Sequence, residues 1–245
     1  MKHSNFVFVT PAFNCEKTIQ QTILSVVAQS YPHWRMVIYD DVSTDTTLTT
    51  ANNIAKVLGI EDRLCVVSRS EKYGEVRNTI DAVSSIDDNE IVCRLDGGDW
   101  LTDNDTLAVL HQMYSTHNPA VLWTKHRWSY TSKNISGPLS TPDADIYKHP
   151  WVTSHLKTFR KNAINNINED NFKDENGDWI MIGCDQAVFL PILHRAYEEN
   201  RARIFLPMVC YHYSIDLEDP TLFSSERSLK QKYSAEWIRD RGYIT

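Results

Sequence analysis

Two carboxylates lie three residues apart in the segment IVCRLDGGDWL, residues 91–101, where Asp96 and Asp99 flank a pair of glycines. The apolar run before them predicts a buried strand, and a carboxylate at the end of such a strand is costly unless it is hydrogen-bonded, paired or bound to a metal. Both acids could cap the turn or helix that follows. Alternatively, they could form a site for a divalent cation and a nucleotide diphosphate, because oxygen ligands suit Mg²⁺ and Mn²⁺ and glycines allow a ligand to approach the backbone closely.

A second pair of acids, Asp40 and Asp41, ends another apolar run, WRMVIYDD. At the end of a strand a carboxylate can accept the imide proton of a uracil, and an aromatic side chain such as Phe13 can pack on the base. A helix N-cap is the alternative role, and it suits Asp45 better than either acid of the pair. A pocket with such a carboxylate and an aromatic ring would select a nucleotide base.

These candidate residues need a fold that brings the ends of several strands together. Runs of β-branched and aromatic residues predict strands, and stretches with helical spacing predict helices. The expected strands are residues 6–10, 34–41, 63–70 and 90–97, and the expected helices are residues 15–29, 42–59 and 74–86. This alternation predicts a parallel sheet of the α/β class, with ligands at the carboxyl ends of its strands.

The second half of the chain is less regular. We expect another strand at residues 119–130, a loop at 131–150, and helices at 151–164 and 184–197 on either side of a polar stretch. The tail, residues 224–243, carries Leu229, Tyr233 and Trp237 four residues apart on one helix face. We expect this helix to pack on its own domain rather than on a partner.

Several motifs in order resemble the family 2 glycosyltransferases of the GT-A fold. That family has a P-x-[YF]-N turn, a helix ending S-x-x-x-Q, a D-D-x-S-x-D-x-T segment, a G-x-x-x-x-R-N segment and a D-x-D-D aspartate motif. The matching residues here are Pro11, Phe13 and Asn14, then Ser25 and Gln29, then Asp40, Asp41, Ser43, Asp45 and Thr47, and then the segments YGEVRNTID, with its spacing shortened, and RLDGGDWL. The resemblance is good over about residues 4–110 and loose beyond them.

The resemblance implies a GT-A fold, in which a Rossmann-like, mostly parallel sheet is flanked by helices and followed by C-terminal helices on the acceptor side. It implies a single domain, whose residues 1–115 bind the nucleotide-sugar and whose residues 116–245 bind the acceptor and form the C-terminal helix. The implied reaction is a hexosyltransferase-type transfer with inversion, from a nucleoside diphosphate sugar, which we expect to be a UDP-sugar, to a hydroxyl of a glycan, lipid or protein. The implied donor-binding residues are Pro11, Phe13, Asn14, Asp40, Asp41, Arg77 and Asp96. The resemblance also implies that one of Asp40 and Asp41 accepts the imide proton of the base. For Arg77 a surface ion pair is an equal alternative, and for Arg94 an internal pair with Asp96 is expected.

Gly98 departs from the family pattern, in which the third position of the aspartate motif supplies the usual metal-binding carboxylate. The resemblance still implies a Mn²⁺ or Mg²⁺ ion held by Asp96 and Asp99, with His212 of the segment CYHYS as a third candidate ligand. A core or surface position is the alternative for His212. If the ion has been lost, Arg or Lys side chains must neutralise the leaving diphosphate, so metal dependence stays open.

Inverting transfer also needs a general base that takes the proton of the acceptor hydroxyl. Asp185, at the start of an apolar helix, matches the position of the family's base, with Asp178 as the second candidate and a helix N-cap as the alternative role for Asp185. Trp151, His155 and Trp179 are candidate acceptor-pocket residues, because aromatic faces suit the C–H faces of sugars, although tryptophans are core residues as often.

Composition narrows the class of protein. The 25 basic and 32 acidic residues give a net charge of −7, which disfavours a nucleic-acid partner. Five scattered cysteines indicate neither a disulfide framework nor a zinc site, and no segment has the length of a membrane span. We therefore expect a cytoplasmic protein whose only membrane contact would be peripheral.

Two other functions remain open from the sequence. A nucleotidyltransferase also uses acids around Mg²⁺, but it requires a glycine-rich basic loop after its first strand, and TPAFNCEKTI has one lysine and no glycine. A non-catalytic nucleotide- or sugar-binding protein derived from a transferase is favoured by Gly98 and disfavoured by Asp185, which such a protein would not need.

Overall fold

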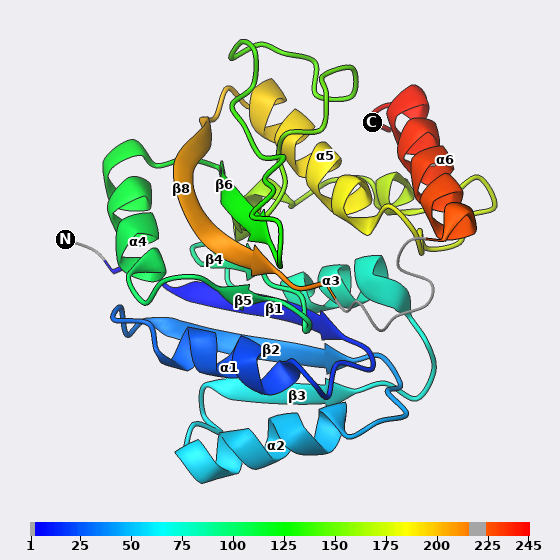
Figure 1. Ribbon diagram of the computed structural model, residues 1–245. Coiled ribbons are helices and arrows are strands. Elements are labelled where there is room, and N and C mark those ends of the chain that lie inside the picture. The colour runs from blue at the N-terminus through cyan, green and yellow to red at the C-terminus, as the bar shows by residue number, and fades with distance from the viewer. Residues whose placement is uncertain (1–2, 216–223) are drawn as a thin grey trace.

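The computed structural model describes residues 3–215 and 224–245, and within them the chain folds around an eight-stranded sheet. The strand order is β3-β2-β1-β4-β7-β6-β8-β5 (Figure 1). The strands are β1 Phe6–Ala12, β2 Trp34–Asp40, β3 Leu64–Ser68, β4 Ile91–Arg94, β5 Trp100–Leu101, β6 Val121–Trp128, β7 Lys157–Arg160 and β8 Arg203–Tyr213.

The first four long strands form the parallel part that the alternation predicts. Strand β1 pairs in parallel with β2 and β4, and β2 pairs in parallel with β3. The second half adds antiparallel pairs of β7 with β4 and β6, and of β5 with β8, while β6 and β8 run parallel. The predicted α/β class and the mostly parallel sheet flanked by helices are confirmed, with a mixed second half.

Helices cover both faces of the sheet. They are α1 Ile19–Val27, α2 Thr47–Leu58, α3 Gly74–Ser84, α4 Thr106–His117, α5 Cys184–Glu198 and α6 Ser225–Arg241, with short 3₁₀ helices η1 Lys161–Ala163 and η2 Glu169–Phe172. Alternate residues of β1 enter opposite cores: Phe8 packs in the core that α1, α2 and α4 cover, and Val9 packs in the core that α3, α5 and α6 cover. Because side chains alternate between the two faces of the sheet and helices cover both faces, β1 is apolar on both sides.

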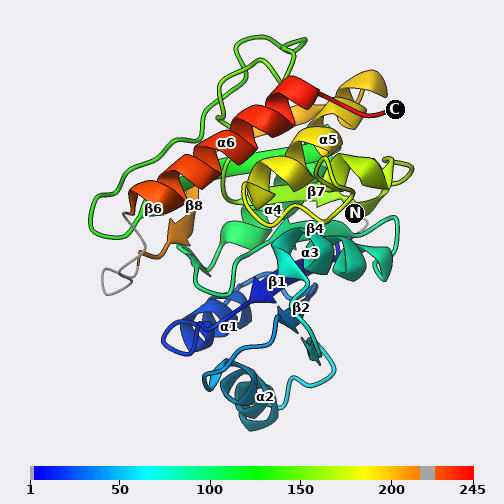
Figure 2. The same ribbon diagram turned by 90° about the vertical axis from the view of Figure 1, so that its right-hand side faces the viewer.

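The C-terminal helix α6 lies beside α5, as Figures 1 and 2 show and their contacts confirm. Its Ile238 is fully buried and Trp237 packs against the same core, so the expectation that the helix packs on its own domain is confirmed at its C-terminal end. The other predicted apolar residues of the helix, Leu229 and Tyr233, remain exposed.

The helix expected at residues 151–164 is wrong. Residues Lys157–Arg160 form strand β7, inserted between β4 and β6, and only the 3₁₀ turn η1 follows it. Phe159 packs in the core of one face, and Leu156, an odd number of residues away, packs in the core of the other. Pairing with two neighbouring strands therefore outweighs the local pattern in this short segment.

The other expectations for the second half are mostly met. Residues 131–150 contain no helix or strand, as expected for a loop, and helix α5 is confirmed. Strand β8 was not predicted. Among the described residues no helix has the length and apolar character to cross a membrane.

Candidate active site

A cavity of about 810 Å³ lies at the carboxyl ends of β1, β2 and β4. Backbone hydrogen bonds hold the three motif segments together there: the Gly97 N–H donates to the Pro11 carbonyl at 3.1 Å, and the Asp41 N–H donates to the Ala12 carbonyl at 2.8 Å. The predicted donor-binding residues that line this cavity are Pro11, Phe13, Asn14, Asp41 and Asp96. Asp40 and Arg77 do not line it.

Asp41 is a buried structural carboxylate. One of its oxygens accepts from the Tyr73 N–H at 2.8 Å and from the Asn78 side chain at 2.9 Å, and the other accepts from the Gly74 N–H at 2.9 Å. Since the Tyr73 and Gly74 N–H groups lie at the start of α3, Asp41 caps that helix from the end of a neighbouring strand. Its free acceptor capacity is therefore small.

Asp40 differs from its neighbour, because one of its oxygens is unsatisfied. Oδ2 accepts from the Ser43 N–H at 3.2 Å, but Oδ1 is buried without a hydrogen-bond partner in the part of the chain that the structure describes. Leaving a buried acceptor unpaired costs about 1–3 kcal/mol. Of the acid pair, Asp40 is thus the one with an unsatisfied oxygen, although that oxygen is buried and Asp40 does not line the cavity.

The remaining predicted residues at this end are positioned by loop contacts. Asn14 has a positive φ of 47°, and its side-chain oxygen accepts from the Thr44 N–H at 2.9 Å, which ties the β1–α1 loop to the β2–α2 loop. The Phe13 ring faces the cavity under the Lys72 ammonium, 3.5 Å from the ring centroid. The Arg77 guanidinium lies 3.6 Å from the Tyr73 ring centroid, which is a cation–π contact rather than the surface ion pair considered above.

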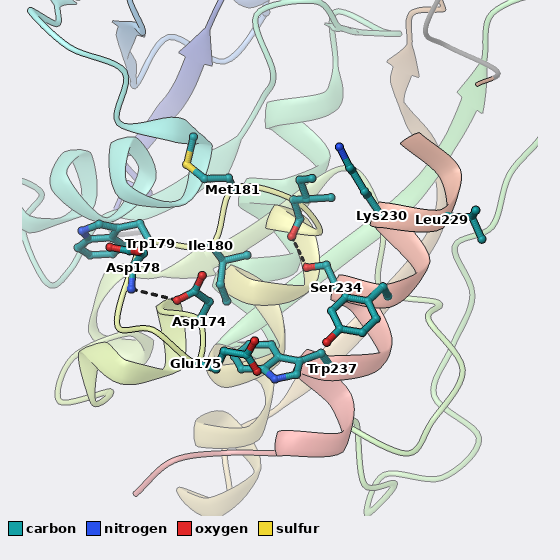
Figure 3. Close-up of a pocket in the computed structure, with 12 residues that line it drawn as sticks. Asp174, Glu175, Asp178, Trp179, Ile180, Met181, Leu229, Lys230, Ser234 and Trp237 are labelled. Atoms are coloured by element: carbon teal, nitrogen blue, oxygen red, sulfur yellow. Dashed lines mark hydrogen bonds between the residues drawn. The ribbon is translucent and has the colours of Figure 1, made fainter. Parts of the chain in front are cut away.

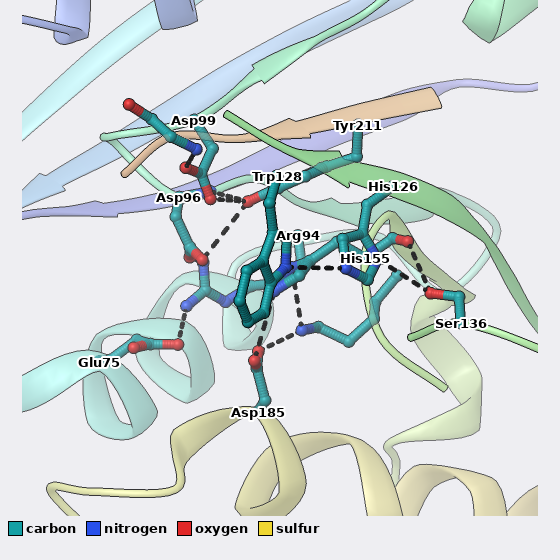
Figure 4. A network of polar contacts seen from close by, with 12 residues as sticks. Glu75, Arg94, Asp96, Asp99, His126, Trp128, Ser136, His155, Asp185 and Tyr211 are labelled. Atoms are coloured by element: carbon teal, nitrogen blue, oxygen red, sulfur yellow. Dashed lines mark hydrogen bonds and ion pairs between the residues drawn. The ribbon is translucent and has the colours of Figure 1, made fainter. Parts of the chain in front are cut away.

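The aspartate motif is joined to a buried arginine (Figure 4). Arg94 donates to Asp96 at 2.5 Å and forms a second ion pair with Glu75 on α3, so the expected Arg94–Asp96 pair is confirmed. The pKa of Glu75 is raised to about 7, mainly by burial. The Arg94 charge opposes this rise, and the neighbouring Asp96 and Asp185 carboxylates add to it. Asp96 and Glu75 line both this cavity and the next one along the site.

Asp99 is committed to the protein. Its Oδ2 accepts from the Tyr211 hydroxyl at 2.6 Å and its Oδ1 accepts from the Ser214 N–H at 2.7 Å, which fastens the aspartate motif to the end of β8. Burial first, and then the Asp96 charge, raises the pKa of Asp99 well above its usual value. Each oxygen of Asp99 thus already accepts one hydrogen bond from the protein.

His212 does not join Asp96 and Asp99, so the structure does not support it as a metal ligand. On β8 it points to the face opposite that of Tyr211 because strand side chains alternate. Its ring stacks on Trp100 at 4.2 Å, Nδ1 accepts from Arg127 at 3.2 Å, and Nε2 lies 2.7 Å from the Ser129 hydroxyl. The surface or core alternative is the one that fits.

A metal cage built by the protein does not fit these residues. Gly98 has no side chain, both oxygens of Asp99 accept hydrogen bonds from the protein, and the described residues contain no group of three or more His, Cys, Asp or Glu arranged to hold an ion. Asp96 keeps Oδ2 weakly engaged, 3.4 Å from the Tyr211 hydroxyl. The donor set fits a cation that Asp96 shares with the phosphates of a ligand, as Mg²⁺ sites often are.

Asp185 lies on a second cavity of about 700 Å³, in the first turn of α5. Oδ1 is ion-paired with Lys157, and Oδ2 lies 3.5 Å from Nε2 of His155. Burial alone would raise the pKa of Asp185, but Lys157 and His155 outweigh it, so this pKa is held well below the usual value. Burial and the Lys157 charge lower the pKa of His155 to about 4, so that at neutral pH His155 is uncharged and Asp185 is ionised.

The other acceptor-side candidates lie apart from one another. Trp151 lines the cavity of Asp185, whereas Asp178 and Trp179 line a separate groove beside α6. His155 is buried, stacks on Tyr211 at 4.5 Å and lines neither.

Several site residues were not found from the sequence, notably Lys157, Glu75 and Tyr211. Lys157 was placed on a helix that does not exist, and Glu75 precedes the arginine of a motif that drew attention to Arg77 alone. Tyr211 adjoins His212 in the segment that was singled out. Reading that segment as a strand, with a period of two, would have directed Tyr211 rather than His212 toward the aspartate motif.

Comparison with known proteins agrees with this geometry. The sequence model of glycosyl transferase family 2 matches residues 7–182. TuaG of Bacillus subtilis (strain 168), named as a glycosyltransferase of teichuronic acid biosynthesis, is 41% identical over 66 residues, which are 27% of this chain and 25% of TuaG. The chain thus matches only a quarter of the length of this curated relative.

Among solved structures, S. aureus TarS residues 1–349 in complex with UDP superposes with a TM-score of 0.67 at 21% identity, over 88% of this chain and 62% of that one. Mannosyltransferase PcManGT from Pyrobaculum calidifontis, in complex with GDP-Man and Mn²⁺, gives a TM-score of 0.61 at 16% identity, over 89% of this chain and 59% of that one. These likenesses show the GT-A fold. Because the family model spans most of the sequence, the chain belongs to glycosyl transferase family 2.

Proposed function

We propose that this protein is an inverting glycosyltransferase of the hexosyltransferase type, which moves a monosaccharide from a nucleoside diphosphate sugar to a hydroxyl of a glycan, lipid or protein. The observation that carries the proposal is that the motif cavity and the cavity of Asp185 share their walls. Glu75, Asp96, Met181, Tyr213 and Arg227 line both. A donor whose nucleotide lies by the motifs would therefore present its sugar toward Asp185.

In this proposal residues 1–115 supply most of the donor pocket and residues 116–245 supply the acceptor side and the base. The division is not strict, because Tyr213, Ser214 and Arg227 from the second part also line the motif cavity. The end of β8 and the start of α6 would therefore lie beside the donor.

A UDP-sugar is the proposed donor. Phe13 lines the motif cavity and offers an aromatic face for the base. The unsatisfied Oδ1 of Asp40 is buried beside this cavity, so it would accept the imide N–H of uracil only once the neighbouring loop moves to uncover it. TarS, with the same fold, was solved with UDP, whereas PcManGT was solved with GDP-Man, so the fold alone does not select the base.

Asp185 is the proposed general base. The acceptor oxygen attacks the anomeric carbon from the face opposite the diphosphate, the bond from that carbon to the diphosphate oxygen breaks, and the hydroxyl proton passes to Asp185. Its low pKa makes Asp185 a weak base, which suffices here because the attacking oxygen becomes strongly acidic as its bond to carbon forms. The ion pair with Lys157 keeps the carboxylate ionised and fixed in orientation.

Charge on the leaving diphosphate needs compensation. Asp96 is the carboxylate that would hold a divalent cation together with the diphosphate, and such a cation would stabilise the negative charge on the leaving group. Lys17 and Arg227 also line the motif cavity and would add positive charge beside the phosphates.

Calorimetric titration of UDP and of UDP-sugars, with Mn²⁺ and with EDTA, tests the donor site. Hydrolysis of the bound UDP-sugar, with water as the acceptor, then tests the base by comparing wild type with Asp185→Asn. The expected results are micromolar UDP binding in both proteins and hydrolysis that is about 10²–10⁴-fold slower in the variant.

Each alternative predicts another result. Binding without any turnover by wild type would indicate a non-catalytic nucleotide-binding protein. Absence of UDP binding, and of binding to any other nucleotide, would refute the transferase proposal altogether.

A further inference from the structure

A groove of about 620 Å³ lies between residues 174–182 and helix α6, outside the two cavities described above (Figure 3). Three aromatic side chains, Trp179, Tyr233 and Trp237, line it. Tyr233 is 66% exposed, and Leu229, one helical turn before it, is 65% exposed. Neighbouring apolar side chains held in water at a concave surface mark a binding site more often than isolated ones do.

The groove continues into the cavity of Asp185. Met181, Ile182 and Lys230 line both, so a ligand that reacts at Asp185 can extend directly into the groove. The position of the junction is fixed by packing: the Met181 sulfur lies over Gly74 at the start of α3, where a side chain would collide with it. On the other wall, the Ser234 hydroxyl donates to the Ile182 carbonyl at 2.5 Å and joins α6 to the segment that faces it.

The polar groups of the groove are mainly acidic. Glu175 and Asp178 are exposed along the segment opposite α6, whereas Asp174 is half-buried and its Oδ1 accepts from the Asp178 N–H (Figure 3). The one lysine of the lining, Lys230, is already paired with Glu226 at 2.7 Å. This charge disfavours phosphate, sulfate or carboxylate groups on a ligand. Carboxylates accept hydrogen bonds from hydroxyl groups, and aromatic faces pack against C–H groups.

We propose that this groove binds an uncharged sugar unit of the acceptor, one or more residues away from the sugar whose hydroxyl reacts at Asp185. The aromatic side chains of the groove match the two apolar faces of a sugar ring. The carboxylates at the rim of the groove match the hydroxyl donors at the edge of the ring. A lipid chain would contact the aromatic lining but would leave the exposed carboxylates of Glu175 and Asp178 without a role. The inference rests on the proposed function in one respect, namely that the bound sugar belongs to the acceptor.

Saturation-transfer difference NMR tests the groove without knowledge of the natural acceptor. The probes are three uncharged trisaccharides (maltotriose, cellotriose and chitotriose) and monomeric octyl β-D-glucoside, whose ring and alkyl protons report separately. The expected result is saturation of the ring protons of at least one trisaccharide and of the octyl glucoside. In Tyr233→Ala, the titrated affinity for the trisaccharide should be about tenfold weaker.

The matched control is Tyr130→Ala, which removes a tyrosine that is 81% exposed and lies outside the groove, and which should leave the saturation unchanged. Far-ultraviolet circular dichroism and thermal melting confirm that both variants fold. Saturation confined to the octyl chain, no saturation of any trisaccharide, or the same affinity in Tyr233→Ala as in wild type would each overturn the proposal. UDP calorimetry on the same samples separates the two proposals, because UDP binding without sugar in the groove refutes only this one.

Discussion

Lys157 on β7 and Asp185 on α5 form an ion pair between two elements that lie 28 residues apart in the sequence. The Lys157 side chain is 3% exposed, whereas that of Asp185 is 32% exposed toward the cavity it lines. The ammonium is thus desolvated and the carboxylate keeps one side open to a ligand. This asymmetry suits the role proposed for Asp185 as a fixed, ionised base.

Replacement of Lys157 by Met should raise the pKa of Asp185, because burial would then act without its main opposing charge. The free energy of unfolding at neutral pH should fall by up to about 3 kcal/mol, the lower end of the range for breaking a buried pair, since Asp185 is partly hydrated. Carboxyl ¹³C shifts followed against pH report the pKa, and urea denaturation reports the stability. The difference between the proteins should be full above the raised pKa of Asp185 in the variant, and it should shrink at lower pH as Asp185 becomes protonated in the variant's folded state.

The control for this variant is Lys161→Met. Lys161 pairs with the exposed Asp88 at 3.0 Å, and a surface pair of this kind contributes at most about 1 kcal/mol. Equal losses of stability in the two variants would contradict the account of Lys157 as a buried partner of the base.

The donor half could be predicted from the sequence because each of its elements has its own local signal. Strands β1, β2 and β4 are apolar runs, their ends carry the motif residues, and parallel pairing places those ends at one edge of the sheet. Asp41 was less predictable, since its role as a cap for α3 depends on a helix start more than thirty residues away.

The acceptor half could not be predicted to the same depth. Lys157 lies in a four-residue strand that exists only because β4 and β6 pair on either side of it. A buried lysine there has no local signal, since its stability depends on Asp185 in another element. His212 lies away from Asp96 and Asp99 for a different reason: the segment was found from the sequence, but the direction of each side chain in it is set by the strand period.

Glu75 should make stability depend on pH between about 4.5 and about 7. Its folded pKa is raised from 4.5 to about 7, so its contribution is fully present below pH 4.5 and is lost as the pH rises toward 7. Glu75→Gln removes this titration, and the fall in unfolding free energy from pH 4.5 to pH 7.5, measured by urea denaturation, should therefore be smaller than in wild type.

Glu169→Gln is the control for Glu75→Gln. Glu169 pairs with Lys173 at the surface, so this variant should keep the wild-type fall in stability between the two pH values. An unchanged fall in Glu75→Gln itself would mean that Glu75 is charged throughout this range.

The two adjacent glycines of the aspartate motif should respond differently to alanine. A Cβ at Gly97 would lie 2.9 Å from Ala12 Cβ and 3.0 Å from Cys15 Sγ, so the packed strand end must shift, whereas a Cβ at Gly98 meets only the Thr18 hydroxyl, at 4.0 Å. Gly97→Ala should lower the free energy of unfolding by about 1–3 kcal/mol. Gly98→Ala should change it by no more than about 0.5 kcal/mol. Urea denaturation of both variants tests this difference. Similar free energies of unfolding would show that the backbone relaxes around Gly97.

The space at Gly98 also allows a carboxylate to be restored there. Gly98→Asp places another negative charge in a cavity already lined by Asp96 and Glu75, so UDP should bind more weakly than in wild type when EDTA is present. With Mn²⁺ present, the second carboxylate should complete a cation site with Asp96, and UDP should bind about tenfold more tightly than in wild type. Calorimetric titration of UDP into the variant under both conditions tests this crossover.

Two further variants separate the effect of the carboxylate from that of the side chain. Gly98→Ala fills the same space without charge and should bind UDP as wild type does in EDTA and in Mn²⁺. In the double variant Asp96→Asn, Gly98→Asp the gain from Mn²⁺ should be lost, because the cation needs both oxygens. If Gly98→Asp instead binds UDP equally in EDTA and in Mn²⁺, the diphosphate does not lie beside the aspartate motif, and the proposed donor orientation is wrong.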